Sequence, residues 1–120
     1  MNWKILALAM VFSIAVLGCA TPSELRTRAP SLELKSNFDA KRVAACIADK
    51  WENALPLLGT QPVNLKITST GYSVAHGVEE TIHLVDISDS PTGGSNTTYY
   101  KNRSSLIERF DPGVVDCQTQ

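Results

Sequence analysis

Between residues 39 and 54, apolar side chains recur every three or four positions, which is the spacing of one face of an α-helix. The members of this stripe are Val43, Ile47, Trp51 and Ala54. Asp39 is suited to cap the start of the helix, and Pro56 ends it because the residue before a proline is kept out of the helical region. The pattern predicts one main helix over residues 39–54, with Trp51 as an anchor on its buried face.

After this helix, the pattern changes to the alternation of apolar and polar residues that is typical of strands. Segments of this kind lie at residues 63–67, 72–75, 81–87 and 95–101. Turn residues separate them, with a longer loop at 89–94. A shorter alternation at 31–36 predicts an edge strand. We expect an antiparallel meander of three or four strands.

The C-terminal part has the signals of a short helix. Ser105 and Glu108 have the spacing of a capping box, and Asp111 followed by Pro112 fits an N-cap and first helical residue. Phe110 would then be buried. The expected fold is α+β with two layers, in which the main helix packs on the meander and the short C-terminal helix lies beside it.

The most apolar stretch of the chain lies near its N-terminus. Residues 5–17 contain thirteen positions of which only Ser13 is polar, and Lys4 precedes them. At the helical rise, thirteen residues span about 20 Å, which is short of the ~30 Å hydrocarbon core of a bilayer. A positive residue, a short apolar region and a small-residue boundary indicate a secretion signal rather than a permanent membrane span.

The end of this signal, Val16-Leu17-Gly18-Cys19, resembles a bacterial lipobox. The resemblance implies cleavage before Cys19, a diacylglycerol on its thiol and an acyl chain on its new amino group. Because Ala20 and not aspartate follows, it also implies sorting to the outer membrane of a Gram-negative bacterium. The alternative is an ordinary signal peptidase that cleaves after Ala20, discards Cys19 and releases a soluble protein.

The chain is accordingly divided into three parts. Residues 1–18 are the lipoprotein signal peptide, and residues 31–120 are a small α+β domain. Residues 19–30 between them are polar, contain two prolines and show no periodicity, so they are interpreted as a lipidated N-terminus followed by a flexible tether.

Two cysteines remain once Cys19 is lipidated. In an oxidising compartment, Cys46 and Cys117 are expected to form a disulfide. Cys46 lies on the flank of the helical stripe, where it can meet a C-terminal segment. Two buried free thiols are the main alternative. A redox pair is disfavoured because the C-x-x-C spacing is absent, and a metal pair because no further cysteine supplies ligands.

Several short motifs together resemble a group of small uncharacterised lipoproteins of Gram-negative bacteria. The most specific are Cys46-Ile47-Ala48-x-x-Trp51, Gly71-Tyr72-x-Val74 and the C-terminal Cys117. The resemblance extends from about residue 43 to residue 117. It implies the lipid anchor, the pairing of Cys46 with Cys117 and a single α+β domain, and it supplies no catalytic residues.

The best candidates for chemistry are two histidines. His76 and His83 would pair across a hairpin if the turn between them centres on Glu79 and Glu80. Two imidazoles with a nearby carboxylate could hold zinc, as in a small zinc-dependent hydrolase. The spacing matches no zinc motif, however, and a slip of one residue would send the two side chains to opposite faces. We favour two ordinary strand residues and therefore expect no metal, no cofactor and no enzymatic activity.

Composition limits the remaining possibilities. The 120 residues contain 43% hydrophobic and 19% charged side chains, which is typical of a globular domain. The formal net charge of −1 argues against a nucleic-acid partner. We expect a lipid-anchored, non-enzymatic protein of the periplasm or cell surface that interacts with an envelope protein through its sheet face or the 88–95 loop. A small-ligand binder, with Trp51 and the tyrosines lining a cleft, is a further alternative.

Overall fold

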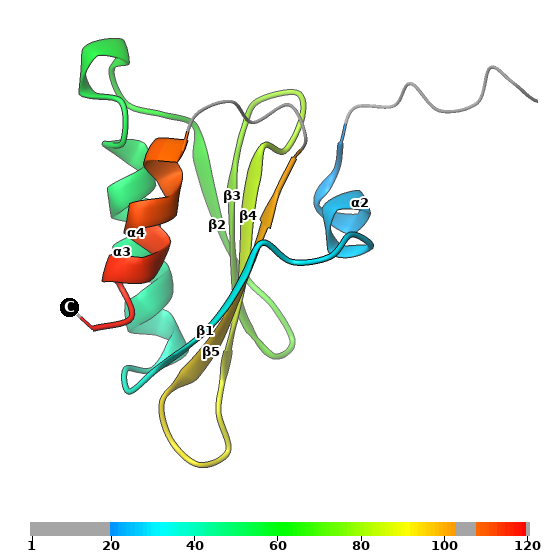
Figure 1. Cartoon of the computed structure of the whole chain (residues 1–120), viewed down its shortest axis with the longest axis vertical. Coiled ribbons are helices and arrows are strands. Elements are labelled where there is room, and N and C mark those ends of the chain that lie inside the picture. The colour runs from blue at the N-terminus through cyan, green and yellow to red at the C-terminus, as the bar shows by residue number, and fades with distance from the viewer. Residues whose placement is uncertain (1–19, 103–107, 120) are drawn as a thin grey trace, which may run out of the picture.

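The computed structural model describes residues 20–102 and 108–119, and these residues form a five-stranded antiparallel sheet with helices on both faces (Figure 1). Helices α3 and α4 cover one face of the sheet, which we call the inner face. The short helix α2 packs on the opposite, outer face. The α+β class and the packing of the main helix on an antiparallel sheet are confirmed.

The strands follow the order β1-β5-β4-β3-β2 across the sheet. Their bounds are β1 (Leu32–Ser36), β2 (Val63–Ile67), β3 (Gly71–His76), β4 (His83–Asp89) and β5 (Ser95–Lys101). Strands β2 to β5 form a meander of four, which agrees with the three or four strands that the sequence predicts. Strand β1 joins β5 at one edge, with Leu32 opposite Tyr99, so the sheet has one strand more than the meander alone.

Helix α3 (Ala40–Glu52) begins where the sequence predicts. The carboxylate of Asp39 accepts a hydrogen bond from the backbone N–H of Arg42 at 2.8 Å and so caps the first turn. The apolar stripe of the helix faces the sheet. The buried residues between them are Ala40, Val43, Ala44, Ile47, Ala48 and Trp51 from α3 with Val74, Val85, Ile87 and Tyr99 from the strands. This cluster is the main core of the protein.

The C-terminal segment closes this core. A 3₁₀ turn, η3 (Glu108–Phe110), leads into α4 (Asp111–Asp116), and Phe110 is buried. Asp111 was expected to be the N-cap, but the cap position belongs to Phe110. The carboxylate of Asp111 instead accepts hydrogen bonds from the Tyr99 hydroxyl at 2.7 Å and the Lys101 ammonium at 2.9 Å. The expected capping-box residue Ser105 lies outside the described residues.

The N-terminal segment differs from the flexible tether expected over residues 19–30. Thr21 caps helix α2 (Pro22–Arg26), and Leu25 is fully buried beside Leu84 on the outer face. The guanidinium of Arg26 binds the carboxylate of Asp86 through two hydrogen bonds, at 2.7 and 2.8 Å. A five-residue helix with one buried leucine has no periodicity to detect, which is why the sequence pattern did not reveal it.

Within residues 20–102 and 108–119, no helix is long and apolar enough to cross a membrane. The expected signal peptide and Cys19 lie outside the described residues.

Candidate functional site

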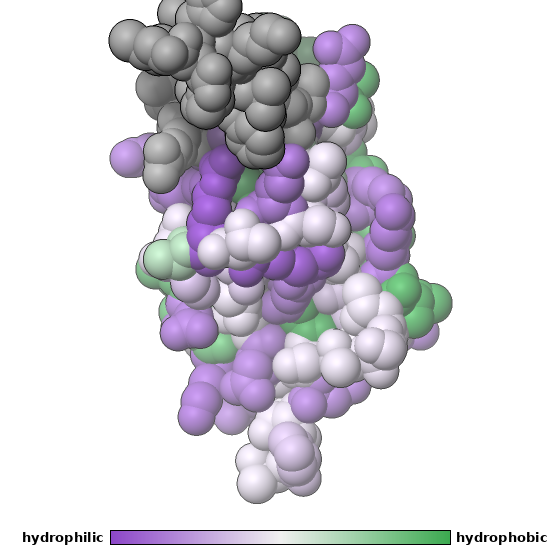
Figure 2. Space-filling model, turned by 90° about the vertical axis from the view of Figure 1, so that its right-hand side faces the viewer, coloured by the Kyte–Doolittle hydropathy of each residue, from purple (hydrophilic) through white to green (hydrophobic). Residues whose placement is uncertain are grey.

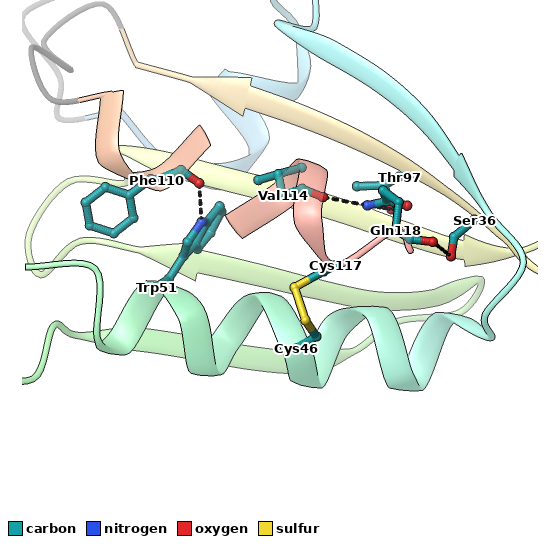
Figure 3. The surroundings of a disulfide bond; sticks show 8 residues. All are labelled: Ser36, Cys46, Trp51, Thr97, Phe110, Val114, Cys117 and Gln118. Carbon is teal, nitrogen blue, oxygen red and sulfur yellow. Dashed lines mark hydrogen bonds between the residues drawn. A yellow bond between two sulfur atoms is a disulfide. The ribbon is translucent and has the colours of Figure 1, made fainter. Parts of the chain in front are cut away.

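The expected pairing of Cys46 with Cys117 is confirmed. The disulfide joins the middle of α3 to the end of α4, and the two Cα atoms are 5.7 Å apart (Figure 3). Cys46 is half-buried on the flank of the helix, as its position in the stripe predicts, and Cys117 is fully buried. The bond thus attaches the C-terminal segment to the main helix.

Gln118 continues this attachment on the other side of the disulfide (Figure 3). Its backbone carbonyl accepts a hydrogen bond from the Ser36 hydroxyl at 2.7 Å, and its side-chain amide donates to the Val114 carbonyl at 2.8 Å. The same amide is within 3.3 Å of the Thr97 hydroxyl. The side chain is buried, so these hydrogen bonds satisfy polar groups that water does not reach. Sequence reasoning missed Gln118 because nothing in the pattern distinguishes it from a polar terminal residue.

The two histidines meet across strands β3 and β4, in the register that a turn centred on Glu79 and Glu80 would give. His76 lies directly opposite His83, with their Nδ1 atoms 2.9 Å apart. One Nδ1 must therefore donate the hydrogen that the other accepts. The ring of Phe110 stacks on both imidazoles, with centroid distances of 4.2 and 4.3 Å. The pair is a polar contact inside an aromatic cluster.

Both histidines are buried, and burial affects the ionisation of His76. His76 is 6% exposed and His83 is 1% exposed. Desolvation lowers the pKa of His76, because a positive imidazolium is poorly stabilised among apolar rings. The hydrogen bond between the two Nδ1 atoms places one proton between the rings, and burial disfavours a further positive charge on His76.

The geometry around the histidines is a poor match for zinc. Two nitrogen ligands at 2.0–2.1 Å from a tetrahedral zinc ion lie about 3.3 Å apart, which is wider than the 2.9 Å observed here. Glu80, the nearby carboxylate that could complete a site, accepts a hydrogen bond from the side-chain amide of Asn102 at 2.7 Å. In the part of the chain that the structure describes, no group of three or more histidine, cysteine or acidic side chains is placed to hold a metal ion.

The prediction that Trp51 anchors the core is confirmed. It is fully buried, and its indole N–H donates to the backbone carbonyl of Phe110 at 2.9 Å (Figure 3). Tyr99 is fully buried too, and burial is the main cause that raises the pKa of its hydroxyl. Tyr100 points to the other face and packs against the cluster around Leu25. Neither Trp51 nor Tyr99 is therefore accessible to line a surface cleft.

The outer face of the sheet carries a polar hollow of about 300 Å³. Its polar lining residues are Arg26, Thr68, Thr70, Asp86, Ser88 and Thr98. The Arg26 guanidinium also donates to the buried Ser73 hydroxyl at 3.1 Å, and the hydrogen bond to Asp86 raises the pKa of Arg26. Figure 2 shows that the surface on this side of the molecule is mostly hydrophilic. The hydroxyls and the ion pair of this hollow are suited to hydrogen bonding rather than to catalysis.

These features define a small disulfide-linked α+β domain whose chemistry-bearing side chains mostly build the core. The chain is similar to a UPF0502 protein of Shewanella sp. (strain MR-4), with 33% identity over 106 residues. The similarity covers 86% of this chain and 46% of the Shewanella protein, so the chain spans about half the length of the curated relative it matches. No family model matches the chain, and no solved structure matches it.

Proposed function

We propose that this protein is a lipoprotein anchored through Cys19 to the outer membrane of a Gram-negative bacterium, where it has a non-enzymatic interaction role. The observation that carries the proposal is the position of Ala20, the residue after the lipobox cysteine. Ala20 is 6% exposed and packs with Leu25 and Leu84, and its carbonyl accepts a hydrogen bond from the Thr81 N–H at 2.8 Å.

This position supports one of the two possible cleavage sites over the other. Cleavage after Ala20 would remove a buried residue and the acceptor of the Thr81 N–H, at a cost of about 0.5–1.5 kcal/mol for the lost hydrogen bond. Cleavage before Cys19 keeps both the contact and the hydrogen bond. The fold therefore favours the lipoprotein route, in which Cys19 becomes the first residue.

The disulfide is consistent with the same route. A buried Cys46–Cys117 bond persists outside the reducing cytosol, in the periplasm or at the cell surface. Export and disulfide formation are thus compatible steps for one chain.

The non-enzymatic role is supported by where the reactive groups lie. His76 and His83 are stacked under Phe110, and the two sulfur atoms are bonded to each other. The groups that remain at the surface of the outer-face hollow are hydroxyls and the Arg26–Asp86 pair, which recognise polar partners by hydrogen bonding. An envelope protein that binds this face is the proposed partner.

The anchor is tested by the intact mass of the protein purified from membranes without a reducing agent. An acylated chain that begins at Cys19, and that is two hydrogen atoms lighter than its reduced form, is the expected result. The matched control is Cys19→Ser, which keeps the size of the side chain but cannot be acylated. A chain that begins at Thr21 would overturn the proposal.

The interaction is tested by a photo-crosslinking residue at Thr98, which lines the hollow on the outer face. The control carries the same residue at Asp49, which is exposed on α3 at the opposite face. A discrete adduct in intact envelopes from position 98, weakened by Asp86→Ala and absent from position 49, is expected. Equal labelling from both positions, or none from position 98, would contradict binding at this face.

A further inference from the structure

Exposed apolar side chains gather at one end of the sheet. Leu57 is 97% exposed and Leu58 is 73% exposed, both in the loop that follows α3, and Val78 is 85% exposed in the turn between β3 and β4. Single exposed apolar residues are common on soluble proteins and need no explanation. Here three of the four most exposed large apolar residues in the described part of the chain lie in two neighbouring loops.

Backbone hydrogen bonds join these loops to each other and to the first described residue. The Gly77 N–H donates to the Pro62 carbonyl at 3.2 Å, which connects the turn with Val78 to the loop with Leu57. The Thr81 N–H donates to the Ala20 carbonyl at 2.8 Å. Both loops lie at the upper end of the molecule in Figure 1, at the same end of the sheet as the start of β2 and the end of β3. The exposed apolar residues and Ala20 therefore share one end of the fold.

The covalent chain also limits how far Cys19 can lie from this end of the fold. Cys19 precedes Ala20 directly, so their Cα atoms are about 3.8 Å apart across a trans peptide bond. Because Ala20 is buried and hydrogen-bonded, little free chain separates an acylated Cys19 from the folded body. A lipid anchor at this point would bring this end of the sheet close to the bilayer.

We infer that the end formed by Leu57, Leu58 and Val78 is a membrane-contacting surface that dips into the headgroup layer beside the acylated Cys19. The inference rests on the proposed lipid anchor. When exposed apolar side chains move from water into the boundary between headgroups and acyl chains, the hydrophobic effect adds to the membrane affinity that the lipid anchor provides. Glu79 is exposed next to Val78, and its negative charge favours a zwitterionic lipid surface over an anionic one.

The test uses the acylated mature protein, which begins at Cys19, in vesicles of phosphatidylcholine that is brominated near the headgroup end of its acyl chains, which quenches nearby tryptophan. Three variants carry one added tryptophan, Leu57→Trp, Val78→Trp or Ile67→Trp. Ile67 is the matched control because it is 83% exposed but lies at the far end of β2, about 13 Å along the strand from Val63. The buried Trp51 contributes the same background to all three.

The expected result is quenching at least threefold stronger for the tryptophans at positions 57 and 78 than for the one at position 67. Vesicle flotation and the intact disulfide are checked first, so that each variant is known to be anchored and folded. Equal or absent quenching in protein that floats with the vesicles overturns the membrane contact and leaves the anchor standing. Shielding of positions 57 and 78 from acrylamide without bromine quenching would indicate a protein contact instead, and also overturns it. Protein that is unacylated and does not float overturns the anchor and the inference together.

Discussion

The two faces of the sheet are covered by different means. On the inner face, α3 and α4 enclose thirteen buried residues, and a disulfide joins the two helices. On the outer face, α2 covers a cluster of three buried residues, Ala20, Leu25 and Leu84. The partly exposed ion pair between Arg26 and Asp86 joins α2 to the sheet. The inner face therefore supplies most of the stability of the fold. The outer face attaches the segment next to Cys19, and because its buried cluster is small we expect it to open without unfolding the rest.

The largest effect is expected from the disulfide on the inner face. The double variant Cys46→Ala/Cys117→Ala releases a loop whose ends are 71 positions apart in the sequence, and the chain-entropy relation gives a loss of about 4 kcal/mol in the free energy of unfolding. Urea denaturation of the purified domain measures it. Ala45→Ser, an exposed change next to Cys46, is the control and should change stability by less than about 0.5 kcal/mol. A loss below about 1 kcal/mol for the double variant would mean that packing alone holds the C-terminal segment.

The second prediction contrasts one leucine on the outer face with one isoleucine on the inner face. Leu25→Ala removes the buried side chain of α2, but α2 can detach, so the loss should stay near the low end for buried leucine, about 2 kcal/mol. Hydrogen exchange should become faster at the Thr81 amide, whose acceptor is the Ala20 carbonyl, while the amides of α3 stay protected.

Ile47→Ala is the matched change on the inner face. It should cost more, about 4 kcal/mol, and accelerate exchange across the whole domain, because no part of the main core can open alone. If Leu25→Ala also accelerates exchange in α3, the two faces form one cooperative unit and the comparison drawn above is wrong.

The same contrast explains how much of the fold the sequence could reveal. The inner face was predictable because periodicity reports burial over long elements. The stripe of Val43, Ile47 and Trp51 predicted α3, and alternation predicted the four strands of the meander. The pairing of Cys46 with Cys117 followed from the cysteine count and the expected compartment. These signals come from local sequence patterns or from the number of cysteines, and they do not depend on knowing which distant segments are in contact.

The outer face and the end of the chain were not predictable in this way. Leu25 is one apolar residue in a polar segment, and its burial depends on Leu84, far along the sequence. Asp111 looked like an N-cap, but Tyr99 and Lys101 occupy its carboxylate. For the candidate site, the sequence offered the register that pairs His76 with His83 as one of two possibilities, and the structure has it. The stacking of Phe110 on both rings was not, because it depends on how the C-terminal segment packs.

The third prediction concerns pH and the buried histidine pair. Burial lowers the pKa of His76 in the folded state, so the unfolded chain binds a proton more readily than the folded one. The stability from this group is therefore fully present above the unfolded pKa of about 6.5 and is lost as the pH falls toward the lower folded value. Urea unfolding at about pH 7.5 and about pH 5 should show a loss of stability on acidification.

The control for this experiment is His76→Gln, which keeps a polar side chain opposite His83 but does not titrate. The charged side chains around the pair are Lys101 and Asp111, which bind each other, and the carboxylate of Glu80, which binds Asn102. They are the same in both proteins, so the variant should lose less stability between the two pH values. An identical loss in wild type and variant would show that the acid sensitivity arises elsewhere.

The smallest effect is expected at Arg26 on the outer face. Arg26 and Asp86 are 37% and 32% exposed, and an ion pair of this exposure contributes only about 0.5 kcal/mol. A double-mutant cycle of Arg26→Ala and Asp86→Ala, measured by urea denaturation at low and high salt, should give a coupling energy of this size that shrinks with salt. Arg26→Lys keeps the charge but cannot form the two parallel hydrogen bonds to Asp86, so it should recover only part of the coupling. A coupling above about 2 kcal/mol would place the pair well outside the range of surface ion pairs. The outer face would then be held nearly as firmly as the inner one, and α2 would be a fixed part of the domain rather than an attachment that opens.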